Sequence, residues 1–219
     1  MIKSWQRKTF YMLAGPAMWI NGRIYRYLRA PKKGLCVHLG PGRRCYLKGW
    51  LNVDANILTA KIDLWANLED SLPFRRNSVR ALYSFSVLEH LSYFRIEPLL
   101  REIYCCLEMG GYARIAVPHV GNAARAYVEN RTDWFGMWPM AYESIGGKFE
   151  NYCLCAGEVR RLFDYSLLAE LLGRAGFTKI VESAPLKTEL PDVFGEVVAT
   201  EHESYPSLPH NIVVEVRKT

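Results

Sequence analysis

The stretch from Gly34 to Asp54 constrains the fold of this chain more than any other part of its sequence. It predicts a buried strand over residues 35–39, a turn with two glycines, and a second short strand over residues 50–53 that ends on the acid. In α/β folds, an acid at the tip of the second strand binds the ribose hydroxyls, beside a turn where a ligand can approach the backbone. The stretch therefore predicts an α/β domain that binds an adenosine-containing cofactor.

The glycine turn differs from the fingerprint of dinucleotide-binding proteins. That fingerprint is GxGxxG, whereas here Gly40 and Gly42 are followed by Arg44 or Cys45 at the third small position. Asp54 follows Gly42 by only twelve residues, where a nucleotide dehydrogenase has its acid after about 20. Both differences count against a nicotinamide cofactor. Taken alone, the two glycines are also compatible with a tight turn that binds no ligand.

Further motifs follow along the chain in a fixed order. They are KIDLWANL at 61–68, LPF at 72–74, NSV at 77–79, SVLEHL at 86–91, Gly110-Gly111, and a strand that closes on Val117-Pro118-His119. This order resembles the class I S-adenosylmethionine-dependent methyltransferases. It is most similar to the small methyltransferase-domain proteins found among bacterial glycan-synthesis genes. The resemblance covers residues 34–119, with a weaker match over 163–177.

The resemblance implies an α/β fold, namely a Rossmann-like, seven-stranded, mostly parallel sheet with helices on both faces. An N-terminal helical extension and an aromatic lid insertion would be added to it. The implied cofactor is S-adenosylmethionine, and the implied activity moves a methyl group to a hydroxyl or amine of a small-molecule or glycan-linked acceptor. Two alternatives stay open: non-methyl-transfer chemistry with the same cofactor, such as cyclisation or alkyl transfer, and a noncatalytic partner- or membrane-binding module on the same fold.

The resemblance also implies which residues bind the cofactor. Gly40 and Gly42 would pass under its methionine part, and Asp54 would bind the ribose hydroxyls. Ser86 and Val87 would form the floor of the site. The other predicted contacts are His38, Ala55, Asn67, Leu68 and Glu89.

Methyl transfer to a hydroxyl requires alignment of the reactants and removal of a proton. His119 follows a strand that ends where open α/β sheets bind ligands, so it is the candidate base. The alternative is that it only caps the strand or forms a hydrogen bond with a loop carbonyl group. The irregular segment from residue 122 to 157 is rich in aromatic residues, as lids and binding loops often are. The candidate acceptor-binding residues in it are Trp134, Phe135, Trp138 and Tyr152, which the alternative interpretation assigns to packing within the lid.

Length and composition fit a single α/β domain. The 219 residues, half of them hydrophobic, can bury one full core. We expect a basic, aromatic extension over residues 1–33 and one domain over 34–219, with the lid at about 120–160. No apolar run is long enough to cross a bilayer, and the N-terminus lacks the layout of a signal peptide. The scattered cysteines favour reduced thiols and a cytoplasmic protein, and the spacing of Cys153 and Cys155 predicts no metal site.

Positive charge is concentrated at the N-terminus. Residues 1–53 contain eleven Lys or Arg and no acid, and aromatic residues are interleaved with them. Such a segment is compatible with peripheral contact to the anionic inner face of a membrane. We favour instead two helices, broken at Gly15-Pro16, that pack their apolar faces on the domain and shield the cofactor, with solvated Arg on the outside. Met18, Ile24, Tyr25 and Leu28 follow the helical stripe that a docked helix would show. No RNA-binding module is visible, so we expect no specific nucleic acid partner.

The second half of the chain predicts the remaining elements. Pro98 suits the first turn of a helix that Gly110-Gly111 would end, before a buried strand over residues 112–117. A helix over 165–175 has Gly176 as its stop. Strands over 179–183 and 212–216 would complete the sheet, and the segment between them is expected to be a surface excursion near the mouth of the site.

Overall fold

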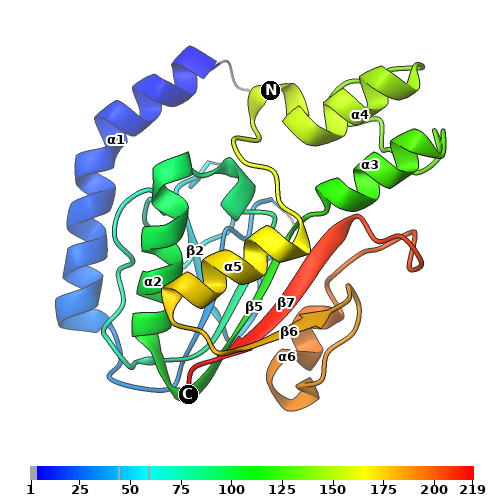
Figure 1. The fold of residues 1–219 in the computed structure, drawn as a ribbon. Helices are drawn as coiled ribbons and strands as arrows, with labels where there is room; N and C mark the ends of the chain where they lie inside the picture. The colour runs from blue at the N-terminus through cyan, green and yellow to red at the C-terminus, as the bar shows by residue number, and fades with distance from the viewer. Residues whose placement is uncertain (1–3, 44, 59) are drawn as a thin grey trace.

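The computed structural model describes residues 4–43, 45–58 and 60–219 of the chain. Its centre is one seven-stranded sheet in the order β3-β2-β1-β4-β5-β7-β6, shown in Figure 1. The first five strands are parallel, and β7 runs antiparallel to both β5 and β6. The strands are β1 (Leu35–Leu39), β2 (Leu51–Asp54), β3 (Leu64–Trp65), β4 (Val79–Phe85), β5 (Leu107–Pro118), β6 (Lys179–Ser183) and β7 (Asn211–Arg217). The predicted Rossmann-like, mostly parallel sheet is confirmed.

Helices cover both faces of this sheet. The α-helices are α1 (Ser4–Ile24), α2 (Ile96–Cys106), α3 (Val120–Val128), α4 (Ile145–Leu154), α5 (Tyr165–Ala175) and α6 (Pro191–Val198). A π-helical turn (Tyr25–Arg29) continues α1, and short 3-10 turns lie at Leu88–His90, Tyr93–Arg95 and Cys155–Gly157. The buried leucines of α2 and α5 pack with the sheet in the main core, and α6 packs with Ala81 and Tyr83 in a second core. None of the described helices is long and apolar enough to cross a membrane.

Local signals explain the bounds of α5. The Asp164 carboxylate accepts a hydrogen bond from the backbone N–H of Leu167 at 2.8 Å, which caps the first turn. Gly176 has a φ of +114°, the left-handed conformation that ends many helices. Between these two residues, Leu168, Leu171 and Leu172 form the buried face. Because every signal agrees, the helix occupies the predicted residues.

The end of α2 differs from the prediction. The helix stops at Cys106, and Gly110-Gly111 lies inside β5. Gly110 has a φ of +79° and donates to the Lys218 carbonyl at 2.8 Å, and a Cβ on Gly111 would lie 3.0 Å from the Val79 carbonyl oxygen. The two glycines therefore form a bulge where β5 comes close to β4, instead of a helix cap.

The segment between β6 and β7 was wrongly predicted to be a surface excursion near the mouth. Phe194 and Val197 of α6 are fully buried. Figure 1 shows α6 at the end of the molecule away from α3 and α4. Only the last part of the segment reaches the lid, where Leu208 is buried in the same cluster as Trp134. The apolar face of α6 is short, so the spacing of its hydrophobic residues did not predict that it would be buried against the sheet.

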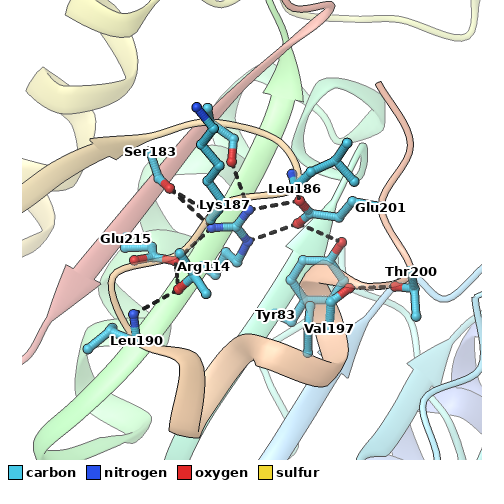
Figure 2. A network of polar contacts seen from close by, with 12 residues as sticks. Tyr83, Arg114, Ser183, Leu186, Lys187, Leu190, Val197, Thr200, Glu201 and Glu215 are labelled. Atoms are coloured by element: carbon cyan, nitrogen blue, oxygen red, sulfur yellow. Dashed lines mark hydrogen bonds and ion pairs between the residues drawn. The ribbon is translucent and has the colours of Figure 1, made fainter. Parts of the chain in front are cut away.

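A buried ion network ties this segment to the sheet. Arg114 on β5 is fully buried and donates twice to Glu201, with both N–O distances 2.8 Å, and once to Glu215 on β7 at 2.6 Å. Figure 2 shows the guanidinium between the two carboxylates, with the Tyr83 hydroxyl donating to Glu201. A fully buried charge is stable only when it is paired and hydrogen-bonded, as it is here.

The N-terminal helix corrects another expectation. α1 runs without a break through Gly15-Pro16, where two helices were predicted. Proline costs a helix one hydrogen bond, here to the carbonyl group of Met12. Pro16 is exposed, so water can bond to that carbonyl group and the helix can continue. Of the predicted docked stripe, Met18 is fully buried, whereas Leu28 is 78% exposed.

Candidate functional site

A cavity of about 630 Å³ opens at the carboxyl ends of the parallel strands. Ligand-binding cavities of open α/β sheets lie at this edge, and their volumes run from about 300 to 1,000 Å³. The structure brings eight of the ten predicted cofactor-binding residues together in its walls. They are Gly40, Gly42, Asp54, Ala55, Asn67, Leu68, Ser86 and Val87.

Gly40 closes the floor of the cavity. Its φ is +66°, and its N–H donates to the carbonyl group of Val53 at 2.9 Å. A Cβ at this position would lie 2.4 Å from Cγ2 of Val87, closer than atoms can pack. The turn after β1 and the end of β4 therefore touch across a position that only glycine can occupy.

Asp54 lies at the end of β2, and its carboxylate accepts hydrogen bonds from two backbone N–H groups. Its Oδ1 accepts from the N–H of Asn56 at 2.9 Å, and its Oδ2 accepts from the N–H of Gly42 at 3.3 Å. A carboxylate has about four acceptor positions, so roughly two stay available for the hydroxyls of a ligand. The two backbone bonds hold the carboxylate in the cavity wall and also hold the glycine turn.

Ser86 adopts an unusual backbone conformation at the end of β4. Its φ is +52°, and its N–H donates to the carbonyl group of Ala116 at 3.0 Å. A left-handed residue other than glycine costs of order 1–3 kcal/mol, and such residues cluster at ligand sites. The strain turns the chain across the cavity floor.

Glu89 lies behind this wall. Its side chain is buried. Its Oε1 lies 3.8 Å from Nε2 of His90, which does line the cavity, and its Oε2 accepts no hydrogen bond within the described part of the chain. Burial raises the pKa of this carboxyl to about 8. Glu89 therefore contacts the predicted site through its neighbours and not directly.

His38 does not reach the cavity, contrary to the prediction. It is buried in β1, where its Nδ1 lies 3.0 Å from Oδ1 of Asn52 and its ring packs 5.1 Å from that of Tyr83. Successive side chains of a strand point to opposite faces, and this one points into the sheet packing. Burial lowers its pKa to about 4, partly offset by the bond to Asn52.

The titration of His38 gives a testable pH dependence. The folded protein keeps this ring neutral down to about pH 4, whereas the unfolded chain protonates it near 6.5. Between about pH 6.5 and pH 4 the unfolded state thus binds more protons than the folded state. The stabilisation that is present above pH 6.5 is therefore lost as the pH falls through this range. We expect the difference in unfolding free energy between wild type and His38→Gln to shrink by about 2 kcal/mol from pH 7 to pH 5, as measured by urea denaturation.

Comparison with the variant removes the contributions of other groups. Glu89 has a raised pKa and contributes the opposite slope, but it does so in both proteins. A difference that stays constant from pH 7 to pH 5 would mean that His38 is not buried as a neutral ring.

His119 also lies outside the walls of the cavity. Its Nδ1 accepts a hydrogen bond from the N–H of Asn122 at 3.3 Å, so it caps α3, and its backbone N–H donates to the carbonyl group of His210. Burial lowers its pKa despite the nearby carboxylates of Glu182 and Asp164. The ring therefore caps a helix, and not the strand as the alternative interpretation had it, and the lone pair that a base would use points at the backbone.

Three of the four predicted acceptor-binding aromatics pack inside the lid. Trp134 and Phe135 are buried, and the Trp134 ring stacks on His210 at 4.2 Å. The hydroxyl of Tyr152 bonds to the carbonyl group of His210 and accepts from the N–H of His119. Only Trp138 among the four is open to a ligand, with 73% of its surface exposed, although it does not line the cavity.

Sequence reasoning missed several residues of the wall. Arg160 follows the lid and pairs with Glu69 at 3.0 Å, and Glu69 also accepts from the N–H and hydroxyl of Ser92. Tyr11 comes from α1, far away in the sequence. His90 also lines the wall, and the motif SVLEHL that contains it was a signal for it. The other missed wall residues are Glu69 and Leu91.

Metal-binding chemistry is not indicated by the described residues, since no group of three or more His, Cys, Asp or Glu among them could hold an ion. The six cysteines are free thiols, and Cys153 is buried. The walls of the cavity combine glycine backbone, two acids (Asp54 and Glu69), basic side chains (His90 and Arg160) and aliphatic groups.

The strand order and the cavity together define the fold of the class I S-adenosylmethionine-dependent methyltransferases. No protein-family model and no curated protein matches the chain. Solved structures match over nearly its full length. One is a methyltransferase of Thermotoga maritima, described as a possible histamine N-methyltransferase, with 19% identity, 98% of this chain and 96% of that chain covered, and a TM-score of 0.53.

Two further solved structures carry the same fold. A methyltransferase of Archaeoglobus fulgidus shares 16% identity over 95% of this chain and 99% of its own, with a TM-score of 0.52. The phosphoethanolamine N-methyltransferase 2 of Haemonchus contortus, in complex with S-adenosylmethionine, shares 13% identity at a TM-score of 0.52. In that pair 91% of this chain is covered, but it spans only 52% of the other protein. At these identities the likeness establishes the fold.

Proposed function

We propose that the protein is an enzyme that binds S-adenosylmethionine and transfers its methyl group to a hydroxyl or amine of a small-molecule or glycan-linked acceptor. The observation that supports this most is the cavity itself. It has the volume of a nucleoside-sized ligand site, and its walls are the ends of four consecutive parallel strands. The sequence motifs and the fold point to the same cofactor.

The residues present fit this cofactor. Asp54 has acceptor positions free for the two ribose hydroxyls, and Asn67 with Leu68 lies at the wall next to it for the adenine. Gly40 and Gly42 leave the backbone open to the methionine part, because neither has a side chain to exclude it. Glu89 has a positioning role in this proposal, since it is buried behind the wall next to His90, which lines the cavity.

When bound, the cofactor supplies a methyl group activated by a positive sulfur. The chain then has to align the acceptor and exclude water. His90 and Arg160 form the part of the wall that the lid segment approaches, because the N–H of Arg160 donates to the carbonyl group of Glu89 at 2.7 Å. We assign the acceptor to this end of the cavity, beside the lid.

Binding and product analysis test the proposal. Isothermal titration with S-adenosylmethionine and with S-adenosylhomocysteine is expected to show one site for each. Mass spectrometry of products after incubation with cell extract and labelled cofactor is expected to show acceptors heavier by one methyl group. Cofactor binding without labelled methyl products would favour cyclisation or alkyl transfer, and no binding of either compound would favour a noncatalytic module.

Replacement of Asp54 tests the placement of the ribose. We expect Asp54→Ala to weaken the binding of S-adenosylhomocysteine by about 1–3 kcal/mol, roughly tenfold to a hundredfold, because charged hydrogen bonds to the ribose are lost. Titration calorimetry measures this change. Glu196→Ala is the matched control, since Glu196 is an exposed acid on α6. Equal affinities of wild type and Asp54→Ala would remove Asp54 from the site.

A further inference from the structure

The α1 helix has two opposite apolar faces. One face docks on the domain, where Met18 is fully buried and the amide of Asn21 donates to the carbonyl group of Trp65 at 2.8 Å. On the same face, Gly22 lies against Pro73. A helix at the surface of a domain needs only one apolar face, and its opposite side normally carries polar residues.

The other face of α1 is apolar and exposed. Leu13, Ile20 and Ile24 have the spacing of seven and four residues that places side chains on one side of a helix, and Met12 and Trp19 border them. Leu28 is 78% exposed and Leu13 is 71% exposed. We call this surface the outward face, and its apolar members are Met12, Leu13, Trp19, Ile20 and Ile24 of α1 and Leu28 of the π-helical turn that continues it. A continuous apolar stripe of this kind marks an interaction surface, whereas single exposed apolar residues do not.

Positive charge is interleaved with the outward face. The guanidinium of Arg23 lies 4.8 Å from the centre of the Trp19 ring and 5.5 Å from that of Tyr27. The exposed Arg29, Lys32 and Lys33 follow at the end of the helix. No acid occurs in the sequence before Asp54, so nothing within the segment neutralises these cations.

We propose that the outward face of α1 docks on the surface of a membrane that contains anionic phospholipids. Arg and Lys next to Trp and Tyr suit the headgroup layer, while aliphatic side chains enter the acyl boundary. A second copy of the chain fits less well, because a two-fold interface would bring this basic surface, which contains no acid, against the same basic surface of the other copy. A nucleic acid would attract the cations but would leave Leu13, Ile20 and Ile24 in water.

Docking would bring the cavity close to the bilayer. Tyr11 lines the cavity, and Met12, the next residue of α1, belongs to the outward face. The helix α1 therefore contributes both to the wall of the cavity and to the outward face. The docking proposal rests on the helix alone and does not depend on the proposed function.

Vesicle cosedimentation of the full chain tests the proposal. We expect binding to vesicles of phosphatidylcholine mixed with phosphatidylglycerol, weaker binding to phosphatidylcholine alone, and loss of binding with added salt. Arg23→Gln should weaken binding about fivefold, since a basic residue near an anionic surface contributes ~1 kcal/mol. Ile20→Gln should weaken it by about tenfold, because an apolar side chain stays in water.

Val128→Gln on α3 is the matched control, because Val128 is 81% exposed and lies outside the outward face. Its binding should equal that of wild type, and urea denaturation should show all variants equally folded, since exposed positions change stability little. Four results would overturn the proposal: no binding to the mixed vesicles, equal loss in the Val128→Gln control, displacement of bound vesicles by an oligonucleotide, or a dimer in light scattering that Ile20→Gln dissociates.

Discussion

Replacing Arg114 by alanine is expected to lower the free energy of unfolding by about 3–5 kcal/mol, as measured by urea denaturation at neutral pH. The substitution leaves two buried carboxylates, Glu201 and Glu215, without the guanidinium that now donates to both. An unpaired buried charge is far more costly than the loss of a favourable contact. Because Glu201 follows α6, that helix should also lose its polar link to the sheet and keep only its apolar packing.

Two further variants separate the buried network from ion pairing in general. Arg174→Ala removes an exposed arginine that also pairs with two acids, Glu170 and Glu97, and is expected to cost at most about 1 kcal/mol. The triple change Arg114→Met, Glu201→Leu and Glu215→Leu is expected to recover much of the lost stability, since apolar residues of similar volume can replace a buried ion network. A cost for Arg114→Ala no larger than that for Arg174→Ala would contradict the buried arrangement.

The second large effect is expected at Gly40. Gly40→Ala should weaken the binding of S-adenosylhomocysteine more than tenfold and lower the unfolding free energy by about 1–3 kcal/mol. Its new Cβ would start 2.4 Å from Cγ2 of Val87, so the cavity floor has to move. Titration calorimetry and urea denaturation report the two effects separately.

Gly49→Ala is the control for backbone strain. Gly49 lies in the same connection between β1 and β2, has a φ of +84°, and has open space where the Cβ would be. It does not line the cavity. We expect this variant to lose about 1–2 kcal/mol of stability from the left-handed backbone alone and to keep its affinity. If both variants bind the ligand equally well, the contact between Gly40 and Val87 does not shape the site.

Sequence patterns predicted several elements to the residue. The strands β1 and β6 and the helix α5 have the expected bounds, since each is delimited by local signals such as Asp164 and Gly176. Such signals act within a few residues, so they can be read without knowledge of the fold. Gly110-Gly111 carried the same signal as Gly176, but here strand pairing with β4 used the glycines for close approach.

The sequence predicted those parts of the site that are formed by the ends of strands. Gly40, Asp54 and Ser86 follow consecutive parallel strands, and the carboxyl ends of such strands meet at one edge of a sheet. His38 failed as a cofactor contact because a one-residue step along a strand reverses the direction of a side chain. His119 is at the correct edge, but its ring is used to cap α3.

Which apolar side chains turn inward was not readable from composition or period. Trp134 and Phe135 have the aromatic character of a ligand site, yet they fill the lid, while Leu13 and Ile20 look like core residues and are exposed. The period of the hydrophobic residues shows which side of a helix or strand is apolar, but not which segment packs against that side. The helix α1 has two apolar sides, and only one of them packs on the domain. The partner depends on which distant segments approach.

The local sequence of this chain determined the strands of the sheet, the helices α2 and α5, the glycine turn and the acid at the tip of β2, because short-range backbone preferences and periodicity act within a few residues. Tertiary structure alone decided that Arg114 would be buried between Glu201 and Glu215 and that Tyr11 and Arg160 would complete the cavity. These contacts join residues far apart in the chain, and they form only when burial of the whole core offsets the entropy of bringing the segments together.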